Sequence, residues 1–298
     1  MRTQWIACMA LGLSFLFLSS FSFADEPVKS ETFTLWQLPS QGPSQMMSYV
    51  ILTPGGKLIV IDGGMKCDAP YLLDFINERA SEVELWIITH PHLDHMDALG
   101  VLLDKGTAPK INKVLASLPE AQWVETHCSE SEFTSFQAFT ESLKNSGLPC
   151  EDAELDQKFE IDGLQFHVLG IRNPEFTQNP LNNSSMVFRV HDPRKSVLFT
   201  GDLGLEGGDK LMKSPLAEFL PSDYVQMAHH GQRGVNEAFY QKVNPSYCLW
   251  TTPLWLWDND RGEGFDTGPW KTVETRGWME KLAIKKHYVM HEGLHQID

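Results

Sequence analysis

Short apolar runs separated by turn-forming and charged residues set the pattern along this chain. Runs rich in Val, Ile and Leu predict buried strands within 32–62 and at 85–89, 113–116, 186–190, 197–200 and 224–228. Apolar residues recur at helical spacing over 70–81, 97–104 and 130–145, which predicts helices there. Residues 159–170 predict a hairpin around Asp162-Gly163. The alternation favours an α/β or α+β fold in which outer helices cover sandwiched sheets.

No internal repeat and no linker divides the 298 residues, so we expect one domain over 25–298. Residues 250–278 differ from the rest because they are rich in Trp, Gly and Asp, which predicts a long surface insertion or extension. Its tryptophans suit an aromatic wall for a sugar, a base or a quaternary ammonium group. Ordinary packing is the alternative explanation.

The first 24 residues resemble a cleavable export signal. Arg2 provides a positive start, residues 5–18 form an almost wholly apolar run, and Ser22-Phe23-Ala24 is a small-x-small cleavage site. The apolar run is shorter than the roughly 20 residues that a membrane-spanning helix needs. We therefore expect a signal peptide over 1–24, no stable membrane anchor after its cleavage, and a periplasmic or secreted protein.

Acidic residues outnumber basic ones, since 39 Asp and Glu against 24 Lys and Arg give a net charge of −15. Removal of residues 1–24 takes away Arg2 and no acid, which leaves −16. A surface of this sign repels polyanions and anionic membranes. The charge disfavours a nucleic-acid partner without excluding one, and we expect a small-molecule or cell-envelope substrate.

Four cysteines follow the predicted signal: Cys67, Cys128, Cys150 and Cys248. An oxidising compartment would allow two disulfides, and Cys128 with Cys150 is the favoured pair because these two bracket a helical segment. Buried free thiols are the alternative. None of the four has C-x-x-C spacing, so a cysteine-bound zinc site is not supported.

Four side chains that can bind metal directly follow the predicted strand at 85–89: His90, His92, Asp94 and His95. His90 and His92 share a face of an extended segment, whereas a following helix would turn Asp94 and His95 in another direction. This arrangement suits two adjacent ions better than one. Imidazole and carboxylate ligands without thiolates suit two Zn²⁺, or another divalent ion such as Mn²⁺ or Fe²⁺.

Two later segments carry similar side chains at predicted strand ends. Thr200-Gly201-Asp202 presents a carboxylate, and Gly201 lets the backbone approach closely. His229-His230-Gly231 presents two imidazoles. Taken alone, an Asp after Gly usually marks a turn and a His pair a surface feature. Their order and placement after the first cluster predict instead that they complete the same metal site.

These motifs together resemble those of the metallo-β-lactamase fold superfamily, over about residues 45–245. The H-x-H-x-D-H motif matches in full at 90–95. The other matches are an early Asp-Gly segment at 62–64, a bridging-aspartate motif at 200–202 and a late histidine motif at 229–231. The resemblance implies a four-layer αββα sandwich of the metallo-β-lactamase type. It also implies two metal ions at one edge of two facing sheets.

The resemblance further implies the role of each ligand. His90 and His92 would bind the first ion, Asp94 and His95 the second, and Asp202 would bridge both. One of His229 and His230 would complete the ligand set of the second ion. Which one remains open, although His230 is the favoured ligand, with His229 facing the substrate.

The chain departs from many members of the superfamily at one ligand. They place a further His between the first cluster and the bridging Asp, whereas residues 180–187 contain none. An Asn-Asn-x-Ser segment at this point resembles that of a particular subgroup of the superfamily. This subgroup includes the extracellular domain of competence-type DNA-uptake proteins and the cell-wall phosphorylcholine esterases. Asn182 or Asn183 would then contact substrate or a metal-bound water. A simple turn is the alternative.

The sequence therefore predicts an exported dinuclear-metal hydrolase that uses a metal-bridging hydroxide, acting on a phosphoester or phosphodiester. Asp94 would orient the hydroxide, and whichever of His229 and His230 is free of metal would donate a proton to the leaving group. A lactone or β-lactam hydrolase is the alternative enzyme. A metal-dependent binding protein without turnover is the alternative from another class.

Overall fold

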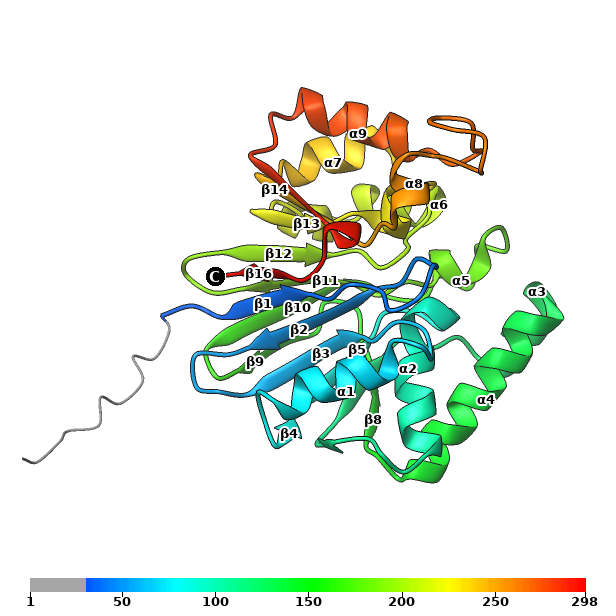
Figure 1. Cartoon of the computed structure of the whole chain (residues 1–298), viewed down its shortest axis with the longest axis vertical. Helices are drawn as coiled ribbons and strands as arrows, with labels where there is room; N and C mark the ends of the chain where they lie inside the picture. Colours follow the sequence, from blue (N-terminus) through cyan, green and yellow to red (C-terminus); the bar gives the residue numbers. More distant parts are fainter. Residues whose placement is uncertain (1–30) are drawn as a thin grey trace, which may run out of the picture.

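The computed structural model describes residues 31–298, and the predicted signal peptide lies outside this range. Two seven-stranded sheets pack face to face, and helices cover the outer face of each (Figure 1). The αββα sandwich expected from the sequence is thereby confirmed. No helix among the described residues is long and apolar enough to cross a membrane.

The first sheet has the strand order β16-β1-β2-β3-β5-β7-β8. Strands β16, β1, β2 and β3 pair antiparallel, whereas β3, β5, β7 and β8 pair parallel. Its strands are β1 Thr34–Gln37, β2 Ser48–Leu52, β3 Leu58–Asp62, β5 Leu85–Ile88, β7 Val114–Ala116, β8 Cys150–Asp152 and β16 His295–Ile297. Two further short strands, β4 Glu82–Val83 and β6 Lys110–Ile111, pair only with each other.

The second sheet has the order β15-β14-β13-β12-β11-β10-β9. Strands β9 to β12 form an antiparallel meander, and β12 to β15 pair parallel. Its strands are β9 Lys158–Ile161, β10 Leu164–Gly170, β11 Val187–His191, β12 Ser196–Phe199, β13 Tyr224–Gln226, β14 Tyr247–Trp250 and β15 Lys286–Val289.

The helices form the two outer layers (Figure 1). Helices α1, α2 and α4 pack on the first sheet, and α6, α7 and α9 pack on the second. The α-helices are α1 Ala69–Asn77, α2 Leu93–Asp104, α3 Ala121–His127, α4 Glu130–Ser146, α5 Pro180–Asn183, α6 Leu205–Lys213, α7 Glu237–Val243, α8 Leu254–Trp257 and α9 Thr272–Lys281. Three 3₁₀ turns are η1 Pro215–Phe219, η2 Ala228–Gly231 and η3 Met290–Glu292.

Strand β3 shows why continuous apolar runs fit this architecture. Side chains alternate across a strand, so Ile59 and Ile61 enter the core between the sheets, while Leu58 and Val60 pack under the helices. All four are at most 1% exposed. A strand buried on both faces has no polar face, which explains its unbroken run of apolar residues.

Several details differ from the sequence-based expectation. Helix α2 begins at Leu93 rather than at 97, which places Asp94 and His95 in its first turn. Helix α1 ends at Asn77, earlier than the expected 81. Only part of 250–278 forms the expected insertion. Trp250 ends the core strand β14 and α9 packs on the second sheet, so only the segment between α8 and α9 lies outside the αββα sandwich.

The favoured disulfide is not formed. Cys67, Cys128, Cys150 and Cys248, the cysteines of the described residues, are all free thiols. Cys248 is fully buried in β14, and burial raises the pKa of its thiol. The expected pairing of Cys128 with Cys150 is therefore wrong in this structure, and the alternative of buried free thiols holds only for Cys248, since Cys67 and Cys150 are exposed and Cys128 is half-buried.

Candidate metal centre

The edge of the sandwich where parallel strands end collects the predicted ligands. Strands β3, β5, β12 and β13 all end there, because parallel neighbours point the same way. After β5, His90 and His92 continue the extended chain, and His92 has φ −92° and ψ 153° as the last residue before α2. Asp94 and His95 lie in the first turn of that helix, where a negative side chain is favourable.

Asp202 approaches from the second sheet. It follows β12, and its backbone N–H donates to Ser185 Oγ at 2.9 Å. Gly201 has φ +53°, and a Cβ there would lie 2.9 Å from Ser185 Oγ and 3.1 Å from Thr89. Only glycine suits this close, left-handed position, which brings the carboxylate of Asp202 beneath the His cluster, where it is 1% exposed.

The two adjacent histidines diverge because of an unusual backbone. His229 and His230 both have positive φ, 51° and 55°, in η2 after β13. Two successive left-handed residues other than glycine are strained and persist only where the surroundings hold them. His229 N–H donates to Gly201 O at 3.1 Å, and Thr252 Oγ1 donates to the carbonyl of His230 at 2.6 Å. The imidazoles consequently leave this turn in different directions.

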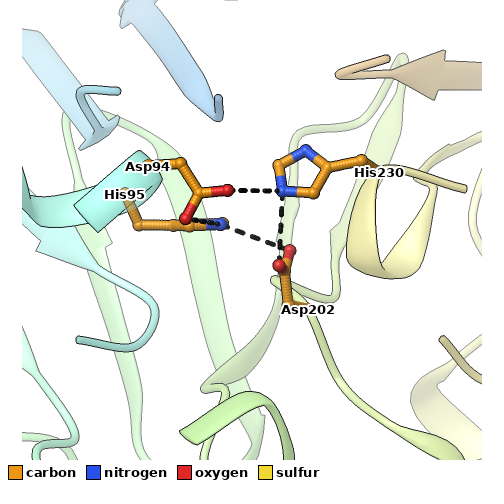
Figure 2. A group of neighbouring side chains, drawn as sticks. All are labelled: Asp94, His95, Asp202 and His230. Carbon is orange, nitrogen blue, oxygen red and sulfur yellow. Dashed lines mark ion pairs between the residues drawn. The ribbon is translucent and has the colours of Figure 1, made fainter. Parts of the chain in front are cut away.

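Two groups of ligand atoms result, and they share Asp202. The first group is His90, His92 and Asp202; the second is Asp94, His95, Asp202 and His230. Within each group the ligand atoms lie within 4.8 Å of one another. Figure 2 shows the second group, in which His230 Nε2 lies 3.1 Å from Asp94 Oδ2 and 3.3 Å from Asp202 Oδ2. In the first group His90 Nε2 and His92 Nδ1 are 3.0 Å apart.

Buried polar atoms without hydrogen bonds mark the centre of the second group. They are His95 Nε2, His230 Nε2 and Asp202 Oδ1. These atoms are held in ion pairs, with His95 Nε2 3.3 Å from Asp202 Oδ1 and His230 Nε2 3.1 Å from Asp94 Oδ2, but none makes a hydrogen bond. All three are good ligands for a divalent ion. The residues therefore fit divalent metal ions, and Asp202 belongs to both ligand groups.

The electrostatics of the second group lead to the same conclusion. Burial lowers the pKa of His95, but the carboxylates of Asp202, Asp62 and Asp94 together raise it well above its usual value. Burial also acts to lower the pKa of His230, but Asp202 and Asp94 raise it to about 9. Without metal, these imidazoles hold protons that balance the carboxylates. Divalent cations would displace the protons, so metal affinity must increase with pH.

Each ligand histidine of the two groups also has a partner for its other ring nitrogen. His95 Nδ1 lies 2.7 Å from Asp62 Oδ2, and His230 Nδ1 lies 2.9 Å from the carbonyl of Thr251. His90 Nδ1 lies 3.2 Å from Thr89 Oγ1. Such partners fix the tautomer and the ring orientation of metal-binding histidines. The Asp-Gly segment at 62–64 thus has a clear role: Asp62 holds His95.

The structure separates the two predicted substrate contacts. Asn182 Nδ2 lies 3.3 Å from His229 Nε2, and Asn182 Oδ1 is buried without a hydrogen bond. Asn183 is fully buried and holds the framework: it donates to the carbonyl of Gln178 and accepts from Gly207 N–H. The prediction of a substrate contact is therefore wrong for Asn183, because its amide is used in packing α5 against α6.

A cavity of about 410 Å³ opens at the two groups. The side chains at its metal end are His92, Asp94, Asp202 and His229, whereas His90, His95 and His230 are buried behind them. Four segments contribute to its walls: the start of α4, the loop before β2, the loop before α1, and α8. Their lining residues are Ser131, Glu132, Ser135, Ser44, Gln45, Met65 and Trp255. None of the described residues that line it is Lys or Arg.

Three of these wall residues carry contacts that sequence reasoning missed or left open. Gln45 Nε2 donates to Asp94 Oδ2 at 3.1 Å, and Gln232 Nε2 donates in turn to Gln45 Oε1 at 3.2 Å. Glu132 contacts His92, and this contact together with Ser129 lowers its pKa to about 2 despite partial burial. Trp255 faces the cavity, but Trp250 and Trp257 pack against each other in the framework. No local pattern marks Gln45 or Glu132 as part of a metal site.

Comparison with known proteins identifies the class. The model of the metallo-beta-lactamase superfamily matches residues 42–239, and the chain belongs to this superfamily. The resemblance inferred from the motifs is thereby confirmed. A curated relative is ComE operon protein 3 of Bacillus subtilis (strain 168), 26% identical over 182 residues. That match covers 60% of this chain but only 21% of the relative, so the chain spans about a fifth of that protein.

Solved structures agree on the fold. The metallo-beta-lactamase fold protein YhfI from Bacillus subtilis superposes with a TM-score of 0.54 at 11% identity, covering 90% of this chain and 100% of that one. CmlA, a diiron beta-hydroxylase from Streptomyces venezuelae, gives a TM-score of 0.51 at 10% identity, covering 90% of this chain and 54% of its own. Likeness at these identities establishes the fold alone.

Proposed function

We propose that this protein is a dinuclear metal-dependent hydrolase that acts on a phosphoester or phosphodiester. The observation that carries the proposal is the pair of ligand groups that share Asp202 at the end of an open cavity, with ligand atoms that make no hydrogen bonds. In this assignment His90 and His92 would hold one ion, Asp94, His95 and His230 would hold the other, and Asp202 would contribute to both. Two divalent ions supply Lewis acidity, which makes hydroxide available near neutral pH and stabilises a developing oxyanion.

The chain's own residues then divide the remaining work. Asp94 lines the cavity, and Gln45 holds its carboxylate by donating to Oδ2, so Asp94 orients the attacking group. His229 lines the cavity and belongs to neither ligand group. Its imidazole lies 3.3 Å from Asn182 Nδ2, which steadies the ring. His229 is therefore our candidate for the proton donor to the leaving group.

The cavity wall restricts the substrate. With no Lys or Arg among the described lining residues and a Glu in the wall, only metal ions would balance a phosphate charge. A small phosphoester or diester suits such a site, whereas a polyanion meets a surface of net charge −15. The absence of Lys and Arg from these lining residues also favours a second candidate with a neutral scissile group, a lactone or β-lactam hydrolase. We also propose export to the periplasm or medium, on the signal-like features of residues 1–24.

Metal analysis and a substrate screen test the proposal. The purified protein should contain close to two divalent ions per chain, and none at all would refute the metal centre. Chromogenic phosphodiester, phosphomonoester, lactone and cephalosporin substrates then rank the two enzyme classes. Inertness toward all of them with two ions bound would contradict hydrolysis and support a metal-dependent binding protein.

One variant pair ties turnover to the bridging ligand. Asp202→Ala removes a ligand that both groups share, so we expect it to lose bound metal and turnover together. Asp74→Ala changes an exposed carboxylate on α1 and should retain both. Full activity in Asp202→Ala would show that the assigned role is wrong.

A further inference from the structure

The four histidines of the two ligand groups differ in what holds their outer nitrogen. Three are held by fully buried residues of the sandwich: His90 by Thr89, His95 by Asp62 and His230 by Thr251. His92 is the exception. Its Nε2 lies 3.4 Å from Glu132 Oε1, on a helix whose start forms a wall of the cavity.

The geometry of the first group shows which nitrogen of His92 faces an ion. His90 Nε2 and His92 Nδ1 lie 3.0 Å apart, so these two atoms converge on one point. One metal ion between them can bind two imidazole nitrogens that lie this close together. His92 must then carry its proton on Nε2, which is the atom that faces Glu132.

Glu132 is well placed to hold that proton. Its other oxygen, Oε2, accepts from Ser129 N–H at 2.7 Å and from Ser129 Oγ at 2.6 Å. These contacts form the capping box that starts α4. Helix α4 is anchored in turn through Phe139 and Leu143, which pack with α2 on the first sheet. The carboxylate is thus fixed by the fold independently of His92.

The first group is also the one that most needs such support. It has three protein ligands, whereas the second group has four. Residues 180–187, where many members of the superfamily supply a further histidine, contribute none. With fewer ligands, the affinity for the first ion depends more strongly on the orientation of each one.

We propose that Glu132 is a positioning residue for the first ion: it holds the Nε2-protonated form of His92 so that Nδ1 faces the metal. The inference rests on the proposed dinuclear centre. Because Glu132 also lines the cavity between Ser131 and Ser135, the start of α4 joins the substrate pocket to the first ion.

The competing explanation is that Glu132 only caps α4, and two variants separate the roles. Glu132→Gln keeps a residue that a capping box accepts. Its amide oxygen must turn toward Ser129 N–H, so its NH₂ group faces the N–H of His92 and the hydrogen bond is lost. Ser129→Ala removes the serine hydroxyl from the cap but leaves the contact between Glu132 and His92.

The experiment measures Zn²⁺ affinity by competition with a chromogenic chelator, together with the thermal unfolding of the metal-free proteins. We expect Glu132→Gln to lower the affinity for one of the two ions by about 10–100-fold. The affinity for the other ion should stay unchanged, with little change in Tm. Ser129→Ala should lower Tm and bind both ions as the wild type does.

Each other outcome has a definite meaning. Wild-type affinities in Glu132→Gln, with or without a lower Tm, would overturn the positioning role and leave the proposed function intact. A wild type that binds no Zn²⁺ would instead refute the metal centre itself. If Glu132→Gln does not fold, Glu132→Asp replaces it: the shorter side chain keeps the charge but no longer reaches His92, and one ion must again bind more weakly.

Discussion

Replacing Asp62 by Asn should weaken the second metal site without unfolding the protein. Asp62 is fully buried and accepts three hydrogen bonds: Thr89 N–H at 2.7 Å on Oδ1, and Thr89 Oγ1 at 2.8 Å and His95 Nδ1 at 2.7 Å on Oδ2. Asn has the same shape and tolerates the positive φ of 57° at this position. The substitution therefore changes hydrogen bonding and charge, and leaves the backbone unstrained.

The magnitude follows from where the amide must point. Thr89 N–H requires the oxygen at the Oδ1 position, so the NH₂ group takes the place of Oδ2 and donates to His95 Nδ1. The metal-bound form of His95 carries its proton on Nδ1 and presents Nε2 to the ion, so in the variant this form loses the acceptor of its Nδ1 proton. We expect the affinity of this ion to decrease about 10–100-fold, or about 1.4–2.8 kcal/mol.

The stability of the metal-free protein should also decrease. Burial raises the pKa of Asp62 even though His95 and Thr89 act to lower it. The buried charge is thus itself costly, and its removal offsets part of the lost hydrogen bonding. His95 also keeps Asp202 Oδ1 at 3.3 Å from its Nε2 as a counter-charge. We therefore expect the free energy of unfolding to decrease by less than the roughly 3–5 kcal/mol that loss of one partner of a buried ion pair costs.

Competition with a chelator, with denaturant unfolding of the metal-free protein, measures both quantities. Asp68→Asn is the matched control: Asp68 is also buried, at 2% exposed, and accepts from the backbone N–H groups of Gln41 and Met65, yet it contacts no proposed ligand. The control should bind two ions normally. Unchanged affinity in Asp62→Asn, or an equal loss in Asp68→Asn, would refute the reasoning about the tautomer.

Two further predictions concern the framework. Gly231 has φ +80°, and a Cβ there would lie 2.3 Å from the ring of the fully buried Trp250; Gly231→Ala should lower the free energy of unfolding by about 2–5 kcal/mol in denaturant titrations. Gly147→Ala, where φ is +67° and no atom lies within 4 Å, should cost only about 1–2 kcal/mol, and equal losses would contradict the steric argument. Lys195 is 6% exposed, and burial lowers its pKa from 10.5 to about 8. Between these values the unfolded chain binds more protons than the fold, so stability rises with pH. Relative to Lys195→Met, the wild type should gain stability from pH 8 to 10, and a constant difference would show that burial does not shift this lysine.

The sequence by itself determined the parts of this protein that depend on neighbouring residues. Runs such as Leu58–Asp62 predict strands buried on both faces, because only apolar residues avoid a desolvation cost on each side. The spacing of His90, His92, Asp94 and His95 predicts two ions, since extended chain and a helix turn point side chains in different directions. The start of α4 at Glu130 follows from Ser129 and Glu132, which form a capping box within one turn.

Only the tertiary structure decided which distant groups meet these residues. The sequence favours His230 over His229 as a ligand without deciding between them. In the structure, two successive positive φ values place His230 in the second ligand group and His229 at the cavity. Asn183 resembles a site residue but is used in packing α5 against α6. Glu132 resembles a helix cap and also reaches His92. Such roles depend on contacts across tens or hundreds of residues, and no local periodicity or spacing records them.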